Sequence, residues 1–318
     1  MILLFGIRTE TSLALVARAL ERAGTPYLLV NQRDVRELAM TLHAGDDGLG
    51  GRLTGPGFAI DLDDVTGVYL RLMDDRRLPE LEGEPPDSPA RARSRAFHDM
   101  VGQWADVAPA RVVNRYEAMG SNFSKPYQSQ LIGRYGFDVP ETLITNDPDA
   151  VRAFRAEHGR LVYKSISGER SIVAALEDDD ERLERIRWCP VQFQAFVGGP
   201  NVRVHTVGDE VFATRIETEA VDYRYASRQT GVAPSFEPYE LDDDVAERCV
   251  RLASGLGLDV AGLDLKLPPD GRVVCLEVNP SPVFSYYEAN TGQPIADAVA
   301  RFLAGAERRV HEPVRQAC

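Results

Sequence analysis

The chemistry of this chain is most visible in residues 259–282, which read DVAGLDLKLPPDGRVVCLEVNPSP. Two apolar runs rich in Val and Leu flank a Pro-Pro-Asp-Gly turn, and strand-forming runs joined by four turn residues predict a β-hairpin. Side-chain alternation along the two strands places Asp264, Glu277 and Asn279 on one face of that hairpin. One or two carboxylates plus a neutral oxygen suit a Mg²⁺ ion that keeps waters and phosphate oxygens. The hairpin therefore predicts a site for Mg²⁺ held together with ATP.

The register of this predicted hairpin pairs Leu267 with Arg272, so that Asp264 faces Cys275. A slip of one residue would carry the Asp264 side chain to the opposite face. Acidic residues on a strand often form a solvated face, and an Asn-Pro pair often opens a turn. These residues alone therefore leave both interpretations open, a metal site and a solvated face.

Lysine is scarce in this chain, because only Lys125, Lys164 and Lys266 occur among 36 basic residues. Lys164 ends a predicted strand and precedes the small-residue loop 165–168, where a compact ammonium suits a phosphate chain. Lys125 lies near a predicted helix start, which is unfavourable for a cation in the helix dipole but useful for holding an anion. Lys266, two residues after Asp264, is predicted to line the same face or its rim. The alternative for each is a surface lysine whose stem packs on the protein.

The N-terminal third of the chain predicts an α/β architecture. A strand at Ile2–Phe5, a helix at Ser12–Ala23 and a strand at Tyr27–Val30 form a β-α-β unit. There is no GxGxxG fingerprint in the first turn, so no dinucleotide site is predicted. A further strand at Val65–Leu72 leads to an acidic, proline-rich loop at Pro79–Pro89, which we expect to be a boundary or a mobile edge.

From Arg111 onward, helix and strand signals are mixed. Asp147 is the predicted N-cap of a helix that starts at Pro148, and a Gly-Asp turn joins two of the predicted strands as a hairpin. The other predicted elements are helices near Ala118–Tyr135, Asp243–Leu256 and Ile295–Leu303, and strands at Glu141–Thr145, Leu161–Ile166, Ser171–Leu176, Val191–Val197, Val202–Val207 and Val211–Glu217.

Composition limits the possible functions. With 318 residues and 44% hydrophobic residues, the chain is long enough for two or three subdomains. A net charge of −13 disfavours binding to nucleic acid or to an anionic membrane. There is no long apolar run and no signal peptide, so we expect a cytoplasmic protein. The four cysteines show no zinc spacing and are expected to be free thiols, and an assembly of identical chains is compatible with the sequence.

Four segments of the chain occur in an order that is typical of one enzyme family. They are the Lys125 segment that runs into Gly136, Pro140 and Thr142; the strand that ends at Lys164; the block QAFV followed by NVR at residues 194–203; and the terminal runs DLK, EVNPSP and ANTGQPIA. From about Arg111 to Leu303 the chain resembles the ATP-grasp ligases of the RimK-like, glutathione-synthetase-like group. The resemblance implies an α/β (α+β) ATP-grasp fold with an N-terminal α/β pre-ATP-grasp domain at residues 1–110. A central ATP-grasp subdomain would occupy 111–190, and a C-terminal subdomain with the Mg-ATP site would occupy 191–318.

The resemblance also implies a role for each matching residue. Lys125 and Lys164 would contact ATP phosphates, and Asp264, Glu277 and Asn279 would hold Mg²⁺. The backbone of four residues would form the hinge that reads adenine: Gln194, Ala195, Phe196 and Val197. Three arginines would be catalytic, with Arg215 facing the γ-phosphate and the nascent acyl phosphate, and with Arg203 and Arg224 near the triphosphate or the substrate carboxylate. The alternative for these arginines is surface pairing with Glu217, Glu219 or Asp222, which contributes about 0–1 kcal/mol each.

Two departures from the family pattern concern the ATP site. The loop after Lys164 reads SISGERS, which is poorer in glycine than the phosphate-covering loop of the ribosomal-protein glutamate ligases. Ala195 replaces an acidic residue that is common beside the hinge. Most of the first 100 residues match no pattern, so the sequence does not identify the acceptor.

The leading hypothesis is an ATP-dependent carboxylate–amine ligase that forms an amide bond through an acyl phosphate. Its partners would be small-molecule or peptide carboxylates and amines. A narrower alternative is a macrocyclase of the microviridin (graspetide) type, supported by the pattern of Glu288, Thr291-Gly292 and Pro294-Ile295 but not by residues 281–284, SPVF. A small precursor-peptide gene next door would favour the macrocyclase. A third hypothesis, a non-catalytic ATP-binding regulatory protein, is disfavoured by retention of both lysines and all three metal positions.

Overall fold

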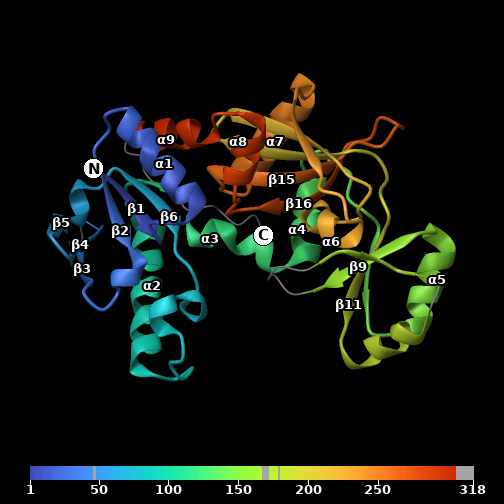
Figure 1. The fold of residues 1–318 in the computed structure, drawn as a ribbon, viewed down its shortest axis with the longest axis horizontal. Helices are drawn as coiled ribbons and strands as arrows, with labels where there is room; N and C mark the ends of the chain where they lie inside the picture. The colour runs from blue at the N-terminus through green and yellow to red at the C-terminus, as the bar shows by residue number, and fades with distance from the viewer. Residues whose placement is uncertain (46–47, 167–171, 178–179, 306–318) are drawn as a thin grey trace.

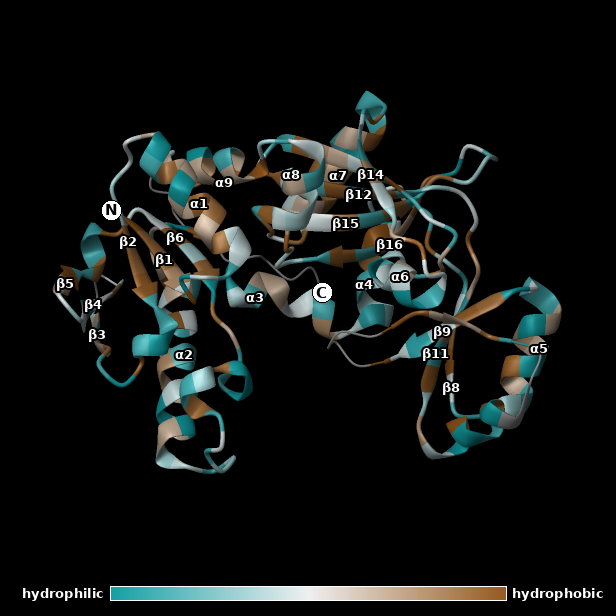
Figure 2. Cartoon of the chain, viewed as in Figure 1, coloured by the Kyte–Doolittle hydropathy of each residue, from teal (hydrophilic) through white to brown (hydrophobic). Residues whose placement is uncertain are grey.

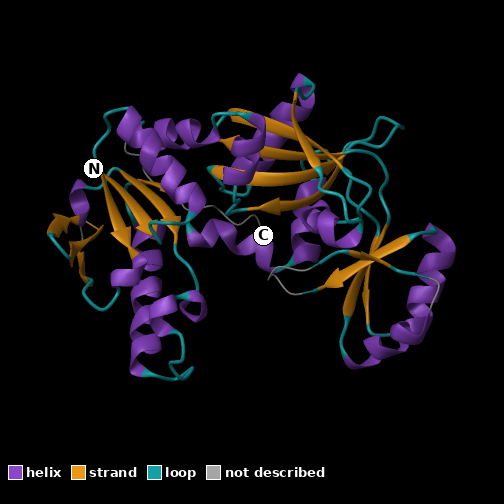
Figure 3. Cartoon of the chain, in the orientation of Figure 1, coloured by secondary structure: helices purple, strands orange, loops and turns teal. Residues whose placement is uncertain are grey.

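The computed structural model describes residues 1–45, 48–166, 172–177 and 180–305. Figure 1 shows the N-terminal elements in blue and cyan at one end, the central elements in green at the other, and the C-terminal sheet in orange and red between them. Figure 3 shows the strands gathered into separate sheets, with helices packed on their faces. Within the described residues, no helix is both long enough and apolar enough to cross a lipid bilayer.

The N-terminal sheet is parallel and has the strand order β2-β1-β6-β7. Its strands are β1 (Ile2–Gly6), β2 (Tyr27–Asn31), β6 (Gly67–Arg71) and β7 (Arg111–Val113). All five residues of β1 are buried, as expected for a parallel strand covered on both faces, and Figure 2 colours β1, β2 and β6 mostly as hydrophobic. The α/β architecture predicted from the sequence is therefore present.

Three helices cover the two faces of this sheet, two on one face and one on the other. Leu4 of β1 packs in one core with residues of α1 (Thr11–Arg22) and α9 (Ile295–Ala304). Phe5, on the opposite face, packs in a second core with Trp104 of α2 (Pro89–Val107). The last helix of the chain therefore stabilises the first sheet.

A small antiparallel sheet of order β3-β4-β5 was not predicted from the sequence. It consists of β3 (Ala39–Gly45), β4 (Gly48–Gly55) and β5 (Phe58–Asp61). Its glycine-rich sequence has weak strand propensity. At Gly51 strands β3 and β4 approach so closely that an added Cβ would lie 2.1 Å from the Thr41 carbonyl oxygen, so this strand pairing requires glycine.

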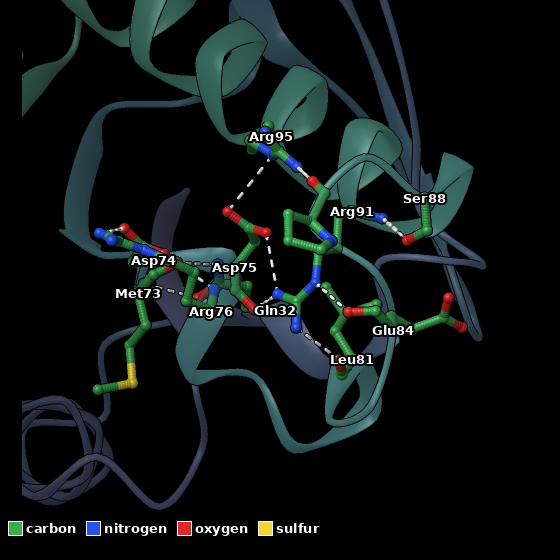
Figure 4. Close-up of polar contacts among 11 residues, drawn as sticks. Gln32, Met73, Asp74, Asp75, Arg76, Leu81, Glu84, Ser88, Arg91 and Arg95 are labelled. Carbon is green, nitrogen blue, oxygen red and sulfur yellow. Dashed lines mark hydrogen bonds and ion pairs between the residues drawn. The ribbon is translucent and has the colours of Figure 1, made fainter.

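The acidic, proline-rich segment after β6 is held by a buried arginine, as Figure 4 shows. The Arg91 guanidinium donates to the Asp75 carboxylate at 3.1 Å and to the backbone carbonyls of Asp75, Leu81 and Glu84 at 2.8–3.0 Å. Two short 3₁₀ turns, Asp75–Arg77 and Pro79–Leu81, wrap around it. Arg91 therefore ties this segment to α2, although most residues of Pro79–Pro89 are exposed. Its expected role as a boundary or mobile edge stays a prediction.

The central sheet is antiparallel and has the order β10-β9-β11-β8. Its strands are β8 (Thr142–Thr145), β9 (Leu161–Ser165), β10 (Ala174–Ala175) and β11 (Val191–Ala195). Helix α5 (Pro148–His158) begins at the predicted N-cap, where the Asp147 carboxylate accepts from the Asp149 N–H. Most of the SISGERS loop lies outside the described residues.

The C-terminal sheet is antiparallel and has the order β14-β13-β12-β15-β16. Its strands are β12 (Asn201–Val207), β13 (Glu210–Glu217), β14 (Ser235–Tyr239), β15 (Val260–Lys266) and β16 (Val274–Asn279). Helix α7 (Asp243–Gly255) covers one face, and α8 (Ser285–Thr291) and α9 cover the other. Strand β14 and helix α8 were not predicted.

The helix predicted at Ala118–Tyr135 is divided in the structure. It consists of α3 (Tyr116–Met119), a short 3₁₀ turn and α4 (Lys125–Gly133). Ser124 is extended, and Pro126 cannot donate a backbone hydrogen bond, so a new helix has to begin here. The break leaves Lys125 as the first residue of α4.

The division at residues 110 and 190 stays a prediction. Strand β7 pairs with β6 of the N-terminal sheet, and β11 pairs with β8 and β9 of the central sheet. Strand pairing therefore crosses both of the predicted boundaries by a few residues.

Replacing Arg91 with alanine should lower the free energy of unfolding by about 3–5 kcal/mol, because the buried Asp75 carboxylate would keep only the more distant, exposed Arg95 as a partner, and three backbone carbonyls would lose their donor. The control is Arg76→Ala, which breaks an exposed pair with Asp74 and should cost about 0–1 kcal/mol. Urea unfolding followed by Trp104 fluorescence measures both. Equal stability of the two variants would contradict a supporting role for Arg91.

Candidate active site

A cleft that is open to solvent lies between the central sheet and the C-terminal sheet. Eight of the twelve residues predicted for the site line it: Lys164, Gln194, Ala195, Phe196, Val197, Arg224, Asp264 and Glu277. Most of the predicted residues therefore lie at one cleft, although they come from separate parts of the chain.

The two predicted metal-binding carboxylates are direct cross-strand neighbours. Asp264 of β15 pairs with Glu277 of β16, and Asn279 lies opposite Gly262. The predicted pairing of Asp264 with Cys275 was wrong, because a β-bulge shifts the register and Cys275 pairs with Leu265 in the core. The bulge leaves Asp264 and Glu277 on a shared face.

Glu277 forms an ion pair with a buried lysine. The Lys125 ammonium lies 3.1 Å from Glu277 Oε1, and its side chain is only 8% exposed. One helical turn later, Gln128 hydrogen-bonds both the N–H and the C=O of Val278, which fixes α4 against the edge of β16. Burial would raise the pKa of Glu277, but Lys125 and Lys164 outweigh it and lower the pKa below its ordinary value. Glu277 is therefore held as a carboxylate.

Lys164 is buried at the end of β9. Burial lowers the pKa of its ammonium from 10.5 to about 8, although Glu277 opposes the shift. Among the described residues, no acidic group lies within ion-pair distance of it. A buried ammonium that lines a cleft suits an anionic ligand.

Asp264 is held at both of its oxygens. Arg203 Nη1 lies 2.9 Å from Oδ2, and the Tyr223 hydroxyl donates to Oδ1 at 3.1 Å. Arg203 crosses Gly262, where an added Cβ would lie 2.1 Å from Nη2, so a side chain at this position would displace the guanidinium. Burial would lower the pKa of Arg203, but the Asp264 carboxylate offsets this and raises it, so the guanidinium stays charged.

The segment between β13 and β14 reaches across the cleft. Asp222 accepts from the Val173 N–H at 3.2 Å, and the Gln229 amide donates to the Val173 C=O at 3.1 Å. Arg224, in the same segment, binds Asp222 and lines the cleft. The contacts to Val173 join the two sides of the cleft, and sequence reasoning missed them. The pair of Arg224 with Asp222 is one that the sequence offered as the alternative for this arginine.

Asn279 adopts the turn that the alternative interpretation described. Its Oδ1 accepts from the Ser281 N–H at 2.9 Å, and Arg71 of the N-terminal sheet binds Ser281 Oγ at 2.7 Å. Asn279 does not line the cleft. Asn279 lies beside Glu277, as the predicted set of Mg²⁺ ligands requires, but its side-chain oxygen already accepts a hydrogen bond within the turn.

Arg215 lies apart from the predicted cluster. It pairs across the sheet with Val202, on the face opposite to Arg203 and Asp264, and its side chain hydrogen-bonds Glu217. The sequence contained the information for this placement. A two-residue Gly-Asp turn sets the register that pairs Arg215 with Val202, and side-chain alternation then puts Arg215 and Arg203 on opposite faces of the sheet. The geometry gives Arg215 the surface pairing that was its alternative, not a place at the phosphates.

The donor set fits a metal that is shared with a ligand. In the part of the chain that the structure describes, no three His, Cys, Asp or Glu side chains gather as a metal site. Mg²⁺ needs only one or two protein carboxylates when phosphates and waters complete its shell. Asp264 and Glu277 meet that requirement beside two lysines.

Comparison with known proteins agrees with this geometry. Residues 124–303 match the family of the RimK-like ATP-grasp domain, which is more than half of the chain. The chain belongs to this family. It is an ATP-grasp ligase, and the fold and enzyme class that the sequence predicted are confirmed.

Three similar proteins illustrate the relationship. A probable alpha-L-glutamate ligase of Sodalis glossinidius is 31% identical over 220 residues, which cover 64% of this chain and 70% of that protein. The ATP-grasp ligase PsnB, solved with a phosphomimetic variant of its minimal precursor, Mg and ADP, is 29% identical, with a TM-score of 0.73 over 95% of this chain and 97% of PsnB. A RiPP-associated ATP-grasp ligase of Chryseobacterium gregarium, solved with ADP and a leader and core peptide, has the same fold, with a TM-score of 0.82 at 20% identity and 98% coverage of both chains.

The pKa of Lys164 predicts how the stability of this ATP-grasp ligase depends on pH. Between pH of about 8 and 10.5 the unfolded chain binds more protons at this lysine than the folded chain does, so stability should rise with pH. Relative to Lys164→Met, the wild type should gain up to about 1.4 kcal/mol per pH unit in this window. Urea unfolding of both proteins without nucleotide measures the difference. Parallel stability curves would contradict a buried, shifted lysine.

Proposed function

We propose that this enzyme uses ATP and Mg²⁺ to activate a carboxylate as an acyl phosphate and then joins it to an amine. The observation that carries the proposal is the convergence of Lys164, Asp264 and Glu277 on one cleft, with Lys125 of α4 bound to Glu277. Two cations and two carboxylates that approach from different elements match what a metal-bound triphosphate requires.

The proposal gives each side of the cleft a part. Lys164 and Lys125 bind phosphate oxygens, while Asp264 and Glu277 hold Mg²⁺, which neutralises charge on those oxygens. Arg224, which lines the cleft, is the arginine best placed to meet the transferred phosphoryl group. Arg203 acts by holding Asp264 and makes no direct contact with the phosphates.

The adenine would lie at the hinge after β11. The N–H groups of Ala195 and Phe196 already donate to the carbonyls of Glu141 and Arg160. The proposal therefore assigns the adenine contact to the N–H of Val197 and to carbonyls of the same segment. Phe196 is held by the Arg160 guanidinium, 4.1 Å from its ring centroid.

The chemistry needs no protein nucleophile. A substrate carboxylate oxygen attacks the γ-phosphorus and ADP leaves. The amine nitrogen then attacks the acyl carbon, phosphate leaves, and the amine loses its proton. The protein acts by positioning and by offsetting charge.

A peptide is the second candidate for the carboxylate substrate. The likeness to peptide-bound ligases covers 95–98% of this chain, whereas the Sodalis glutamate ligase matches 64% of it. A macrocyclase that joins side chains of a precursor peptide therefore stays the alternative to an enzyme for free amino acids. The experiment that distinguishes these two functions measures ADP release, first with free amino acids and then with a peptide encoded beside the gene.

Hydroxylamine should intercept the activated carboxylate. With ATP, Mg²⁺ and the true carboxylate substrate, the enzyme should release ADP and phosphate and form a hydroxamate even without the natural amine. Mass spectrometry detects the hydroxamate, and nucleotide chromatography separates ADP from AMP. Release of AMP and pyrophosphate would mean attack at the α-phosphate and would overturn the acyl-phosphate route.

Replacing Glu277 with glutamine should reduce Mg²⁺-dependent ADP formation by about 100-fold to 1,000-fold while the protein stays folded, because a charge-stabilising contact is lost. The matched control is Glu210→Gln, which removes an exposed partner of Arg301 far from the cleft. Steady-state kinetics at varied Mg²⁺ measure both variants. Wild-type kinetics for Glu277→Gln would remove this residue from the metal site.

A further inference from the structure

Two tyrosines that the sequence did not indicate meet at Asp264. Tyr223 belongs to the short 3₁₀ turn Tyr223–Tyr225, and its hydroxyl lies 3.1 Å from Asp264 Oδ1. The same hydroxyl lies 2.8 Å from the hydroxyl of Tyr287, a buried residue of α8. The three side chains come from three elements that are far apart in sequence.

The direction of these hydrogen bonds follows from counting protons. A phenol has one proton to donate, and a carboxylate only accepts. Tyr223 therefore donates to Asp264, and Tyr287 has to donate to Tyr223. The result is a directed chain from Tyr287 through Tyr223 to Asp264, with no phenol proton left over.

The far end of this chain is rigidly packed. The Tyr287 ring meets the rings of His205 and Phe236 edge-to-face, with centroids 4.8 Å and 5.9 Å away. The Arg203 guanidinium lies 5.8 Å from its ring centroid. Tyr287 therefore offers Tyr223 a fixed donor.

The geometry points to Tyr223 as a positioning residue for Asp264. With Arg203 on Oδ2 and Tyr223 on Oδ1, the plane of the carboxylate is fixed from both sides. A carboxylate has about four lone-pair sites, so two remain for a ligand on the cleft side. Hydrogen bonds of this kind orient a metal ligand and set its affinity. This inference rests on the proposed Mg²⁺ site.

The test is the binding of Mn²⁺ to the full chain with ADP, measured by electron paramagnetic resonance of the free ion. Mn²⁺ accepts the same oxygen ligands as Mg²⁺. Tyr223→Phe removes only the hydroxyl and should weaken Mn²⁺ binding about 10-fold to 100-fold. Calorimetry should show unchanged binding of metal-free ADP, because Tyr223 acts through the metal ligand. Tyr287→Phe should have a smaller effect in the same direction.

The matched control is Tyr225→Phe in the same short turn, where the Arg228 guanidinium lies 5.9 Å from the ring centroid. It should bind Mn²⁺ as the wild type does. Wild-type Mn²⁺ affinity in Tyr223→Phe would overturn the positioning role and leave the proposed function intact. An equal loss in Tyr225→Phe, or a parallel loss of metal-free ADP binding, would mean general disruption and would also overturn it. Failure of the wild type to bind Mn²⁺ with ADP would overturn the proposed function itself.

Discussion

The structure depends on how two neighbouring carboxylates are compensated. Asp264 and Glu277 lie directly opposite each other on paired strands, an arrangement that destabilises a sheet when both are charged. Arg203 and Lys125 each pair with one of them. The two cations come from β12 and from the start of α4, so these elements can pack only where the charges meet. The cluster of Asp264 and Glu277 lowers the stability of the sheet unless both cations are present. Clusters of this kind are typical of functional sites.

The N-terminal sheet is attached to the same hairpin. The Asn114 side chain, just after β7, accepts from the N–H groups of Asp259 and Val260 and donates to the carbonyls of Val260 and Pro280. It thus holds both the start of β15 and the turn after β16, so that all four of its hydrogen-bonding positions are used. Arg71 at the end of β6 binds the next residues of that turn. The carboxyl edge of a parallel sheet, where α/β proteins usually bind ligands, therefore adjoins the turn after β16.

The sequence predicted what depends on local patterns. Alternation placed Asp264 and Glu277 on one face, and capping residues marked α5 at its correct start. It did not predict the bulge, because one extra residue in β16 changes the register without changing the hydrophobic pattern. It could not predict Tyr223, because a tyrosine between two strands has no periodic signal and its partner Asp264 is 41 residues away. The register that places Arg215 on the face opposite to Arg203 could have been derived from the Gly-Asp turn before it.

The central claim is that the cleft holds a metal-bound nucleotide between Lys164 and the two carboxylates. A crystal structure of the full chain with ADP and Mn²⁺ tests it most directly, because anomalous scattering locates Mn²⁺ independently of the nucleotide density. The account predicts a peak about 2.1 Å from oxygens of Asp264 and Glu277, with the ADP phosphates against Lys164 and the adenine at Val197. Nucleotide bound elsewhere, or Mn²⁺ held away from both carboxylates, would contradict it.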